Sequence, residues 1–158
     1  MTSLTRRTCW ALGIAAAVLE AAAAVINGLG YSMGALGTFA ALAVGCTMLL
    51  LATTEKHGGE VQTVFMLSAL CVLLSMLGGI LGLLFGALVW PLCAACFIKA
   101  DADKRMTTIV IGLGAVQLLA AFIPGGKPVY VAALVAGVAH ILWCVRQYKA
   151  TESDGDGE

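Results

Sequence analysis

Three polar side chains in this 158-residue chain stand within long apolar stretches, and together they have the chemistry of proton or cation binding. Glu20, Gln117 and His140 are each flanked by uncharged residues. A carboxylate beside an imidazole can accept and release protons, or bind a cation or a polar solute. We predict a substrate- or proton-binding site at Glu20, Gln117 and His140. The alternative for each is a structural hydrogen bond to a neighbouring helix.

A proline interrupts a fourth apolar stretch, at Trp90-Pro91. Proline removes one backbone hydrogen bond, so the carbonyl of Ala87 loses its usual partner and a helix kink is expected. Freed backbone at such a kink can line a binding site, although membrane helices also tolerate proline for shape alone.

No cofactor or metal site is predicted, because the chain has no phosphate-binding loop, zinc-binding helix or nucleophile elbow. Several loop residues could bind a metal only loosely, and the lysines among them suggest a solvated surface instead: Glu55, His57, Glu60, Asp101 and Asp103.

The composition places these residues in a membrane protein. Apolar residues make up 61% of the chain and charged residues 11%, and the mean hydropathy is +0.98. Soluble domains are about half apolar and about a quarter charged. Nine basic and nine acidic residues cancel, so nucleic acid is not an expected partner.

The apolar runs predict an all-α bundle of six transmembrane helices. A spanning helix needs about 20 apolar residues, and the run over residues 61–98 is long enough for two helices divided at Gly78-Gly79. The predicted helices cover residues 9–29, 34–52, 61–77, 80–98, 107–123 and 128–147, and the first could close the bundle against the sixth.

The basic residues predict that both ends of the chain are cytosolic. Lysine and arginine accumulate on the cytoplasmic side of a membrane. With six helices and the N-terminus inside, Lys127 alone lies outside, and the other eight lie inside: Arg6, Arg7, Lys56, Lys99, Lys104, Arg105, Arg146 and Lys149. We therefore expect a cytoplasmic (inner or plasma) membrane location, with residues 1–8 as a cytosolic N-terminal tail. The acidic residues 149–158 should form a disordered cytosolic tail. The alternative, a signal peptide cleaved near Ala22-Ala23-Ala24, is opposed by Glu20 within the apolar stretch.

A shift of 46 residues reveals an internal repeat that divides the helices into three hairpins, residues 9–52, 61–98 and 107–147. Phe39-Ala40-Ala41-Leu42 aligns with Phe85-Gly86-Ala87-Leu88 and with Val131-Ala132-Ala133-Leu134. Small residues mark where membrane helices pack closely, and the predicted packing positions are Gly78, Gly82 and Gly86. Packing within the chain is favoured over a homo-oligomer interface.

The six cysteines include one pair with redox spacing, Cys93-Ala-Ala-Cys96. This spacing resembles that of membrane thiol oxidoreductases of the vitamin K epoxide reductase kind, which hold reactive cysteines near the non-cytoplasmic face. The charge distribution here places Cys93 and Cys96 in the cytoplasmic half, and no second pair is found in an outer loop. The chain is therefore not expected to be an enzyme, with a thiol oxidoreductase as the minor alternative.

These features favour a transporter or channel for a small solute or ion, with proton coupling as an option. The alternative is a non-catalytic subunit of a larger transport complex. In size and helix number the chain resembles the substrate-capture components of energy-coupling-factor vitamin transporters, which dock through an alanine-rich first helix. The alanines that carry this resemblance are Ala11, Ala15, Ala17 and Ala21. It extends no further than size, helix number and alanine spacing.

Overall fold

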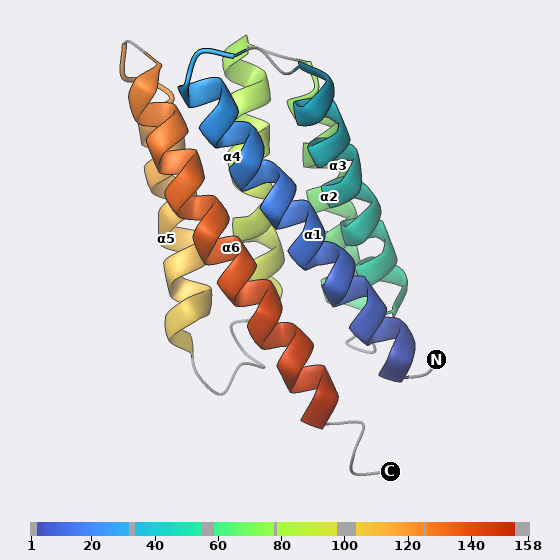
Figure 1. The fold of residues 1–158 in the computed structure, drawn as a ribbon. Coiled ribbons are helices and arrows are strands. Elements are labelled where there is room, and N and C mark those ends of the chain that lie inside the picture. The colour runs from blue at the N-terminus through green and yellow to red at the C-terminus, as the bar shows by residue number, and fades with distance from the viewer. Residues whose placement is uncertain are drawn as a thin grey trace.

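Six α-helices form the protein in the computed structural model, which describes residues 3–31, 34–54, 59–77, 79–97, 104–124 and 126–153 (Figure 1). No strand occurs in these described ranges. The helices are α1 (Ser3–Gly28), α2 (Gly34–Thr54), α3 (Gly59–Ser75), α4 (Gly79–Phe97), α5 (Lys104–Ala120) and α6 (Lys127–Ser153). The prediction of an all-helical chain with six helices is confirmed, including a break between α3 and α4 beside Gly78, which itself lies outside the described residues.

The observed helices differ from the predicted ones mainly at the two ends of the chain. α1 already begins at Ser3 and α6 continues to Ser153, so parts of both predicted tails are helical. The two extensions contact each other, since the Arg7 guanidinium lies 5.0 Å from the centre of the Tyr148 ring. α5 ends three residues early at Ala120, because Pro124 disfavours helical geometry before it and residues 121–123 form turns instead.

The helices form a closed ring in chain order. Each packs against its neighbours in sequence, and the most extensive contact joins α1 to α6, as expected for a closed bundle. α1 lies between α6 and α2 in one layer, and α4 lies between α5 and α3 in the layer behind it (Figure 1). Because the helices alternate in direction, α1 begins and α6 ends at the same end of the bundle. We call this the terminal end, and the other the opposite end.

The buried interior is packed differently in the two halves of the bundle. The largest fully buried side chains all lie at the helix midpoints or in the half nearer the terminal end: Trp10, Trp90, Trp143, Phe65, Met48, Leu51, Val44, Val110, Thr47, Thr107, Cys93 and Cys144. In the opposite half, the described buried positions hold only alanine, glycine, serine, cysteine and valine. Large side chains therefore fill the terminal half, whereas small ones line the interior of the other.

Glycines allow close helix contacts within the chain. A methyl group added at Gly82 would lie 2.6 Å from the Ser75 carbonyl oxygen, and one at Gly86 would lie 3.6 Å from the Ser75 side chain. Two of the three predicted packing glycines therefore face α3, and the third, Gly78, lies outside the described residues. A methyl group at Gly137 of α6 would lie 3.0 Å from Ala21 Cβ of α1. Close packing of small residues is how helices associate in lipid, where hydrophobic burial contributes little.

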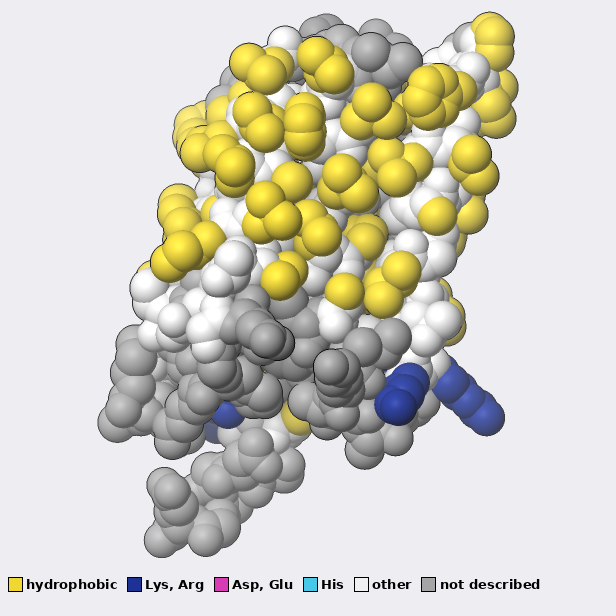
Figure 2. All heavy atoms as spheres, turned by 180° about the vertical axis from the view of Figure 1, so that it is seen from behind, with side chains coloured by type: hydrophobic (Ala, Val, Ile, Leu, Met, Phe, Trp, Pro, Cys, Tyr) yellow, Lys and Arg dark blue, Asp and Glu magenta, His cyan; other side chains and the backbone are white. Residues whose placement is uncertain are grey.

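The outer surface is apolar around the bundle. Every helix exposes large apolar side chains, among them Leu12, Phe39, Leu70, Leu81, Leu119 and Val131. Figure 2 shows hydrophobic side chains spread over the described part of one face, with basic side chains at its lower end. Two helical segments, Thr5–Gly28 and Lys127–Thr151, are long and apolar enough to cross a membrane, and shorter apolar segments lie in α2, α3 and α4. Only a third of each long segment is buried within the protein.

Positions aligned by the 46-residue shift are not equally buried. Two shifts of 46 residues align Val18 with Val110. Val18 is 47% exposed, whereas Val110 is fully buried. Ala23 and Ala69 are buried, but Ala115 is exposed. The repeat therefore does not direct the same positions of each hairpin into the interior.

Candidate functional site

The buried faces of α1, α4 and α6 meet at Glu20, Trp90 and His140. On α1, buried residues recur at Ala16 and Ala17 and again at Ala23 and Ala24, and Glu20 lies on the same face between them. Residues three or four positions apart share one side of a helix. The carboxylate is therefore directed towards the interior by its position on α1.

Trp90 holds the carboxylate of Glu20 in place. The indole Nε1–H of Trp90 donates a hydrogen bond of 2.6 Å to Glu20 Oε2. Because an indole N–H can only donate, it pairs with a carboxylate oxygen that accepts. Trp90 is 1% exposed, whereas 31% of the Glu20 side chain is accessible. One oxygen of Glu20 is thus anchored on α4, and part of the carboxylate side chain remains accessible.

His140 lies on the buried side of the same carboxylate. Its ring stacks on the Trp90 indole with centres 4.9 Å apart, and its Nδ1 lies 3.8 Å from Glu20 Oε2. His140 is 4% exposed, and neither ring nitrogen has a hydrogen-bond partner among the described residues. A buried imidazole without partners is energetically unfavourable, so a hydrogen-bond partner for His140 would lower this cost.

All three tryptophans of the chain belong to one aromatic cluster on the terminal side of Glu20. Trp143 packs edge-on against Trp90 at 6.4 Å, and Trp10 packs edge-on against Trp143 at 5.4 Å. Trp10 and Trp143 were not among the predicted site residues. Their positions along the helices could have indicated them. Trp10 and Trp143 lie in the halves of α1 and α6 nearest the terminal end, and Trp90 lies in the same half of α4.

Gln117 is not part of this group. It is partly exposed on α5, and no hydrogen bond joins its side chain to Glu20 or His140 in the described part of the chain. α5 packs against α4 and α6. Of the three predicted polar residues, the structure therefore brings together Glu20 and His140 and leaves Gln117 apart from them.

Pro91 is the contact point between α4 and α5. α4 continues on both sides of Pro91, and the proline ring lies directly against Gly114. A methyl group at Gly114 would also lie 3.2 Å from the carbonyl oxygen of Ala87, the group that Pro91 deprives of its usual donor. The absence of a side chain at Gly114 is what allows α5 to lie so close to Pro91.

The remaining predicted chemistry is either dispersed or outside the described residues. Cys93 is a buried thiol whose Sγ donates to Met48 Sδ at 3.1 Å, and the Cys96 side chain is not described. No group of three or more His, Cys, Asp or Glu side chains comes together within the described ranges. The loop candidates Glu55, His57, Asp101 and Asp103 lie outside those ranges, as does the Glu60 side chain.

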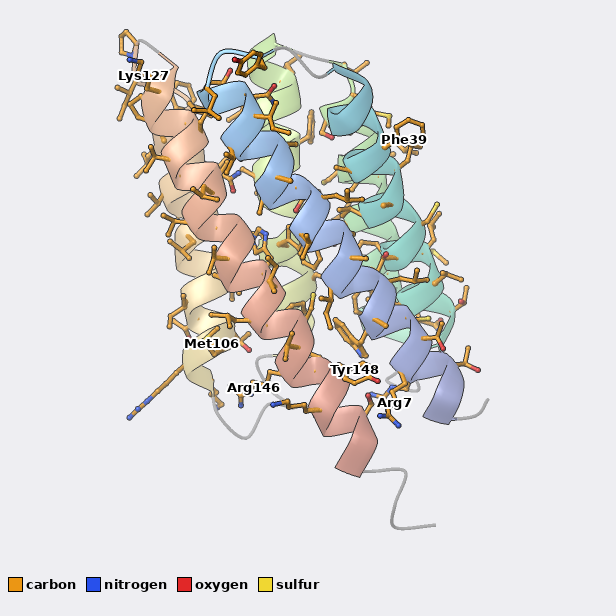
Figure 3. The ribbon with its side chains drawn as sticks, in the orientation of Figure 1. Arg7, Phe39, Met106, Lys127, Arg146 and Tyr148 are labelled. Carbon is orange, nitrogen blue, oxygen red and sulfur yellow. The ribbon has the colours of Figure 1, made fainter. Side chains whose placement is uncertain are left out.

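The described basic side chains lie at the two ends of the bundle. Arg7 and Arg146 lie at the terminal end, where Arg7 is beside Tyr148, and Lys127 lies at the opposite end (Figure 3). Among the described residues, His140 is therefore the one side chain close to Glu20 that can carry a positive charge.

Comparison of the chain with known protein families, with curated proteins and with solved structures finds no match.

We expect Trp90→Phe to destabilise the protein by about 1.5–3 kcal/mol, the usual cost of losing a hydrogen bond to a charged group. The measurement is unfolding in detergent, with Trp143→Phe as the matched loss of an indole that does not bond to Glu20. The cost of Trp90→Phe should shrink in a Glu20→Gln background, since a neutral acceptor forms a weaker bond. Equal costs in both backgrounds would show that the charge of Glu20 does not strengthen the bond from Trp90.

Proposed function

We propose that this chain is a small integral membrane protein that transports a small solute or ion through a polar site near the bilayer midplane. The observation that carries the proposal is the arrangement of Glu20, Trp90 and His140. An acidic side chain directed into an apolar bundle, beside an unpartnered buried histidine, is costly and typical of a solute or proton pathway. No catalytic role is assigned to any residue.

The surface supports a membrane setting for all six helices. Exposed Leu, Val, Ile, Met and Phe side chains surround the bundle, and apolar surface of this extent is unusual on a soluble monomer (Figure 2). We propose that the helices form three membrane-crossing hairpins related by the 46-residue repeat. Both ends of the chain would then be cytosolic, in the cytoplasmic membrane, as the distribution of basic residues indicates.

This membrane topology predicts which positions a water-soluble reagent can reach. A cysteine introduced at Lys127 should react in intact cells with a maleimide that cannot cross membranes. A cysteine at Lys149 should react only after the cells are permeabilised. The unmodified chain, with its six native cysteines, provides the background. Labelling of both positions from outside, or of Lys149 alone, contradicts the proposed orientation.

Transport itself can be tested without knowing the substrate. The full chain is reconstituted into liposomes on a solid-supported membrane, and charge movement is recorded after jumps of pH and of ammonium, methylammonium, acetate and glycine. The proposal predicts a saturable current for a pH jump or for at least one of these solutes. Protein-free liposomes provide the baseline. No current above that baseline for any probe would remove support for an autonomous transporter of charged solutes.

The second candidate, a non-catalytic subunit or substrate-capture component, is favoured by the asymmetry of the interior, which suits a site loaded from one end. The alanine-rich docking face expected on α1 is divided, however. Ala11 and Ala15 are exposed, whereas Ala17 is buried and Ala21 packs against Gly137. Native mass spectrometry of gently extracted protein discriminates the two functions. A stoichiometric partner protein favours the subunit, and a monomer or symmetric oligomer favours the transporter.

A further inference from the structure

The charge balance around Glu20 indicates the kind of solute that the site would hold. No lysine or arginine of the described residues pairs with its carboxylate, and the nearest group able to carry positive charge is His140. An uncompensated negative charge inside an apolar bundle is strongly unfavourable. When His140 is neutral, a bound cation is therefore the natural partner of Glu20.

The Glu20 side chain has a buried side and an accessible side, and each could meet a different cation. Oε2 faces Trp90 and the buried ring of His140, whereas the accessible part of the side chain is free of any described hydrogen bond. The buried side is suited to a proton, because neither His140 nitrogen has a partner and the carboxylate lies 3.8 Å away. The accessible side is the one from which a larger cation could reach the carboxylate.

The side chains in the adjacent helix turns favour a small organic cation over a metal ion. One turn towards the opposite end from Glu20, Trp90 and His140, the same helix faces carry Ala23, Ala24, Ala87 and Ala136. These side chains offer methyl groups and no oxygen ligands. A metal cation such as Ca²⁺ needs about six to eight oxygen ligands, whereas an alkylammonium can form a charge-assisted bond to one carboxylate and place its carbon atoms against alanine.

Entry from the opposite end follows from the packing. On the terminal side of His140, Trp143 and Trp10 fill the interior and are fully buried. On the other side the buried residues are small. Approach to Glu20 from the opposite end would therefore displace less buried side-chain volume than approach from the terminal end.

We propose that Glu20 binds a small protonated amine on its accessible side, and that a proton taken up by His140 behind it expels the amine. This deepens the proposed function and rests on it for its transport role. Protonated His140 neutralises the single negative charge that both cations need, so amine and proton exclude one another. The proton comes from water, and no covalent bond other than N–H forms. Among the described residues, the titratable groups that face Glu20 are His140 and Cys144 of α6, while α4 contributes Trp90, which does not titrate.

The test is equilibrium binding of methylammonium chloride to the purified full chain in detergent. Intrinsic fluorescence is the readout, since all three tryptophans lie in the cluster beside the site, and calorimetry provides a second signal. We expect saturable binding at pH 8 and a dissociation constant about tenfold or more higher at pH 5.5, a range that spans ordinary histidine titration. Sodium and tetramethylammonium, which carry charge but no N–H donor, should bind about tenfold more weakly or not at all.

Variants test whether Glu20 binds the amine and whether His140 causes the dependence of binding on pH. Glu20→Gln keeps the acceptor for Trp90 and should lose methylammonium binding, whereas Glu152→Gln, the same change in the last turn of α6, should bind normally. His140→Gln should retain binding at pH 8 with less than about a threefold change at pH 5.5. If it does not fold, His140→Asn replaces it.

The proposal is overturned by equal responses to sodium or tetramethylammonium, by binding that survives in Glu20→Gln, or by an affinity independent of pH. A response to protons with none to methylammonium also overturns it. Binding without any transport current would instead support this site and contradict the transporter function. Current without methylammonium binding would support the transporter function and contradict this site.

Discussion

Replacing Glu20 by glutamine is expected to reduce solute- or proton-driven current by about 100-fold or more while leaving the bundle folded. The carboxylate is the one acidic group described within the interior, and the transported charge is proposed to bind to it. Glutamine has nearly the same shape, and its side-chain oxygen can still accept the hydrogen bond from Trp90 Nε1. The change therefore removes the charge and keeps the contact. The measurement is current from reconstituted liposomes at matched protein density.

The same acid-to-amide change at Glu152, in the last turn of α6, is the control. Glu152→Gln should carry normal current. Helix content by circular dichroism and the elution volume in detergent should be unchanged for both variants. Unchanged current in Glu20→Gln would show that Glu20 does not bind the transported species, whatever the protein transports.

A methyl group at Gly114 is expected to cost about 1–3 kcal/mol of stability, the usual penalty for adding volume to a packed contact, and a valine should cost more. The added carbon would overlap the Pro91 ring and approach the Ala87 carbonyl oxygen. Neither neighbour can move easily, because the proline ring is rigid and the carbonyl belongs to the α4 backbone. α5 must therefore shift away from α4. The measurement is the free energy of unfolding in mixed detergent micelles.

Gly112 gives a matched control two residues away on the same helix. A methyl group there meets nothing within 4 Å. Gly112→Ala should be neutral or slightly stabilising, since alanine is the better helix former. Equal effects at the two positions would mean that the close contact between Pro91 and Gly114 does not limit the packing of α4 and α5.

The helices could be predicted from the sequence because their signals are local. The length of each apolar run, the paired glycines at residues 78–79 and the charged residues between runs were sufficient to locate all six. The differences arise where polar residues continue a helix. Arg7 and Tyr148 stabilise each other across α1 and α6, and that contact cannot be read from either segment alone.

The site could be predicted only in part. Glu20 and His140 stand out as polar residues in apolar stretches, and the contact of the first helix with the last brings them together. Trp90 was noticed for its proline neighbour, yet its main role is to donate a hydrogen bond to Glu20 from a helix 70 positions away in sequence. Gln117, like Glu20, is a polar residue in an apolar stretch. It lies on α5, and no hydrogen bond joins it to Glu20 or His140 among the described residues.

The sequence by itself thus determined the number of helices and their approximate ends, because run length, glycine, proline and charge act locally. Only the tertiary structure decided how each helix is rotated. In these helices apolar residues cover both faces, so the pattern that orients an amphipathic helix is weak. Ala17 is buried and Val18 is exposed, although both are apolar. Gly112 and Gly114 look alike in the sequence, but only Gly114 lies against Pro91, because the contact between α4 and α5 selects one face of each.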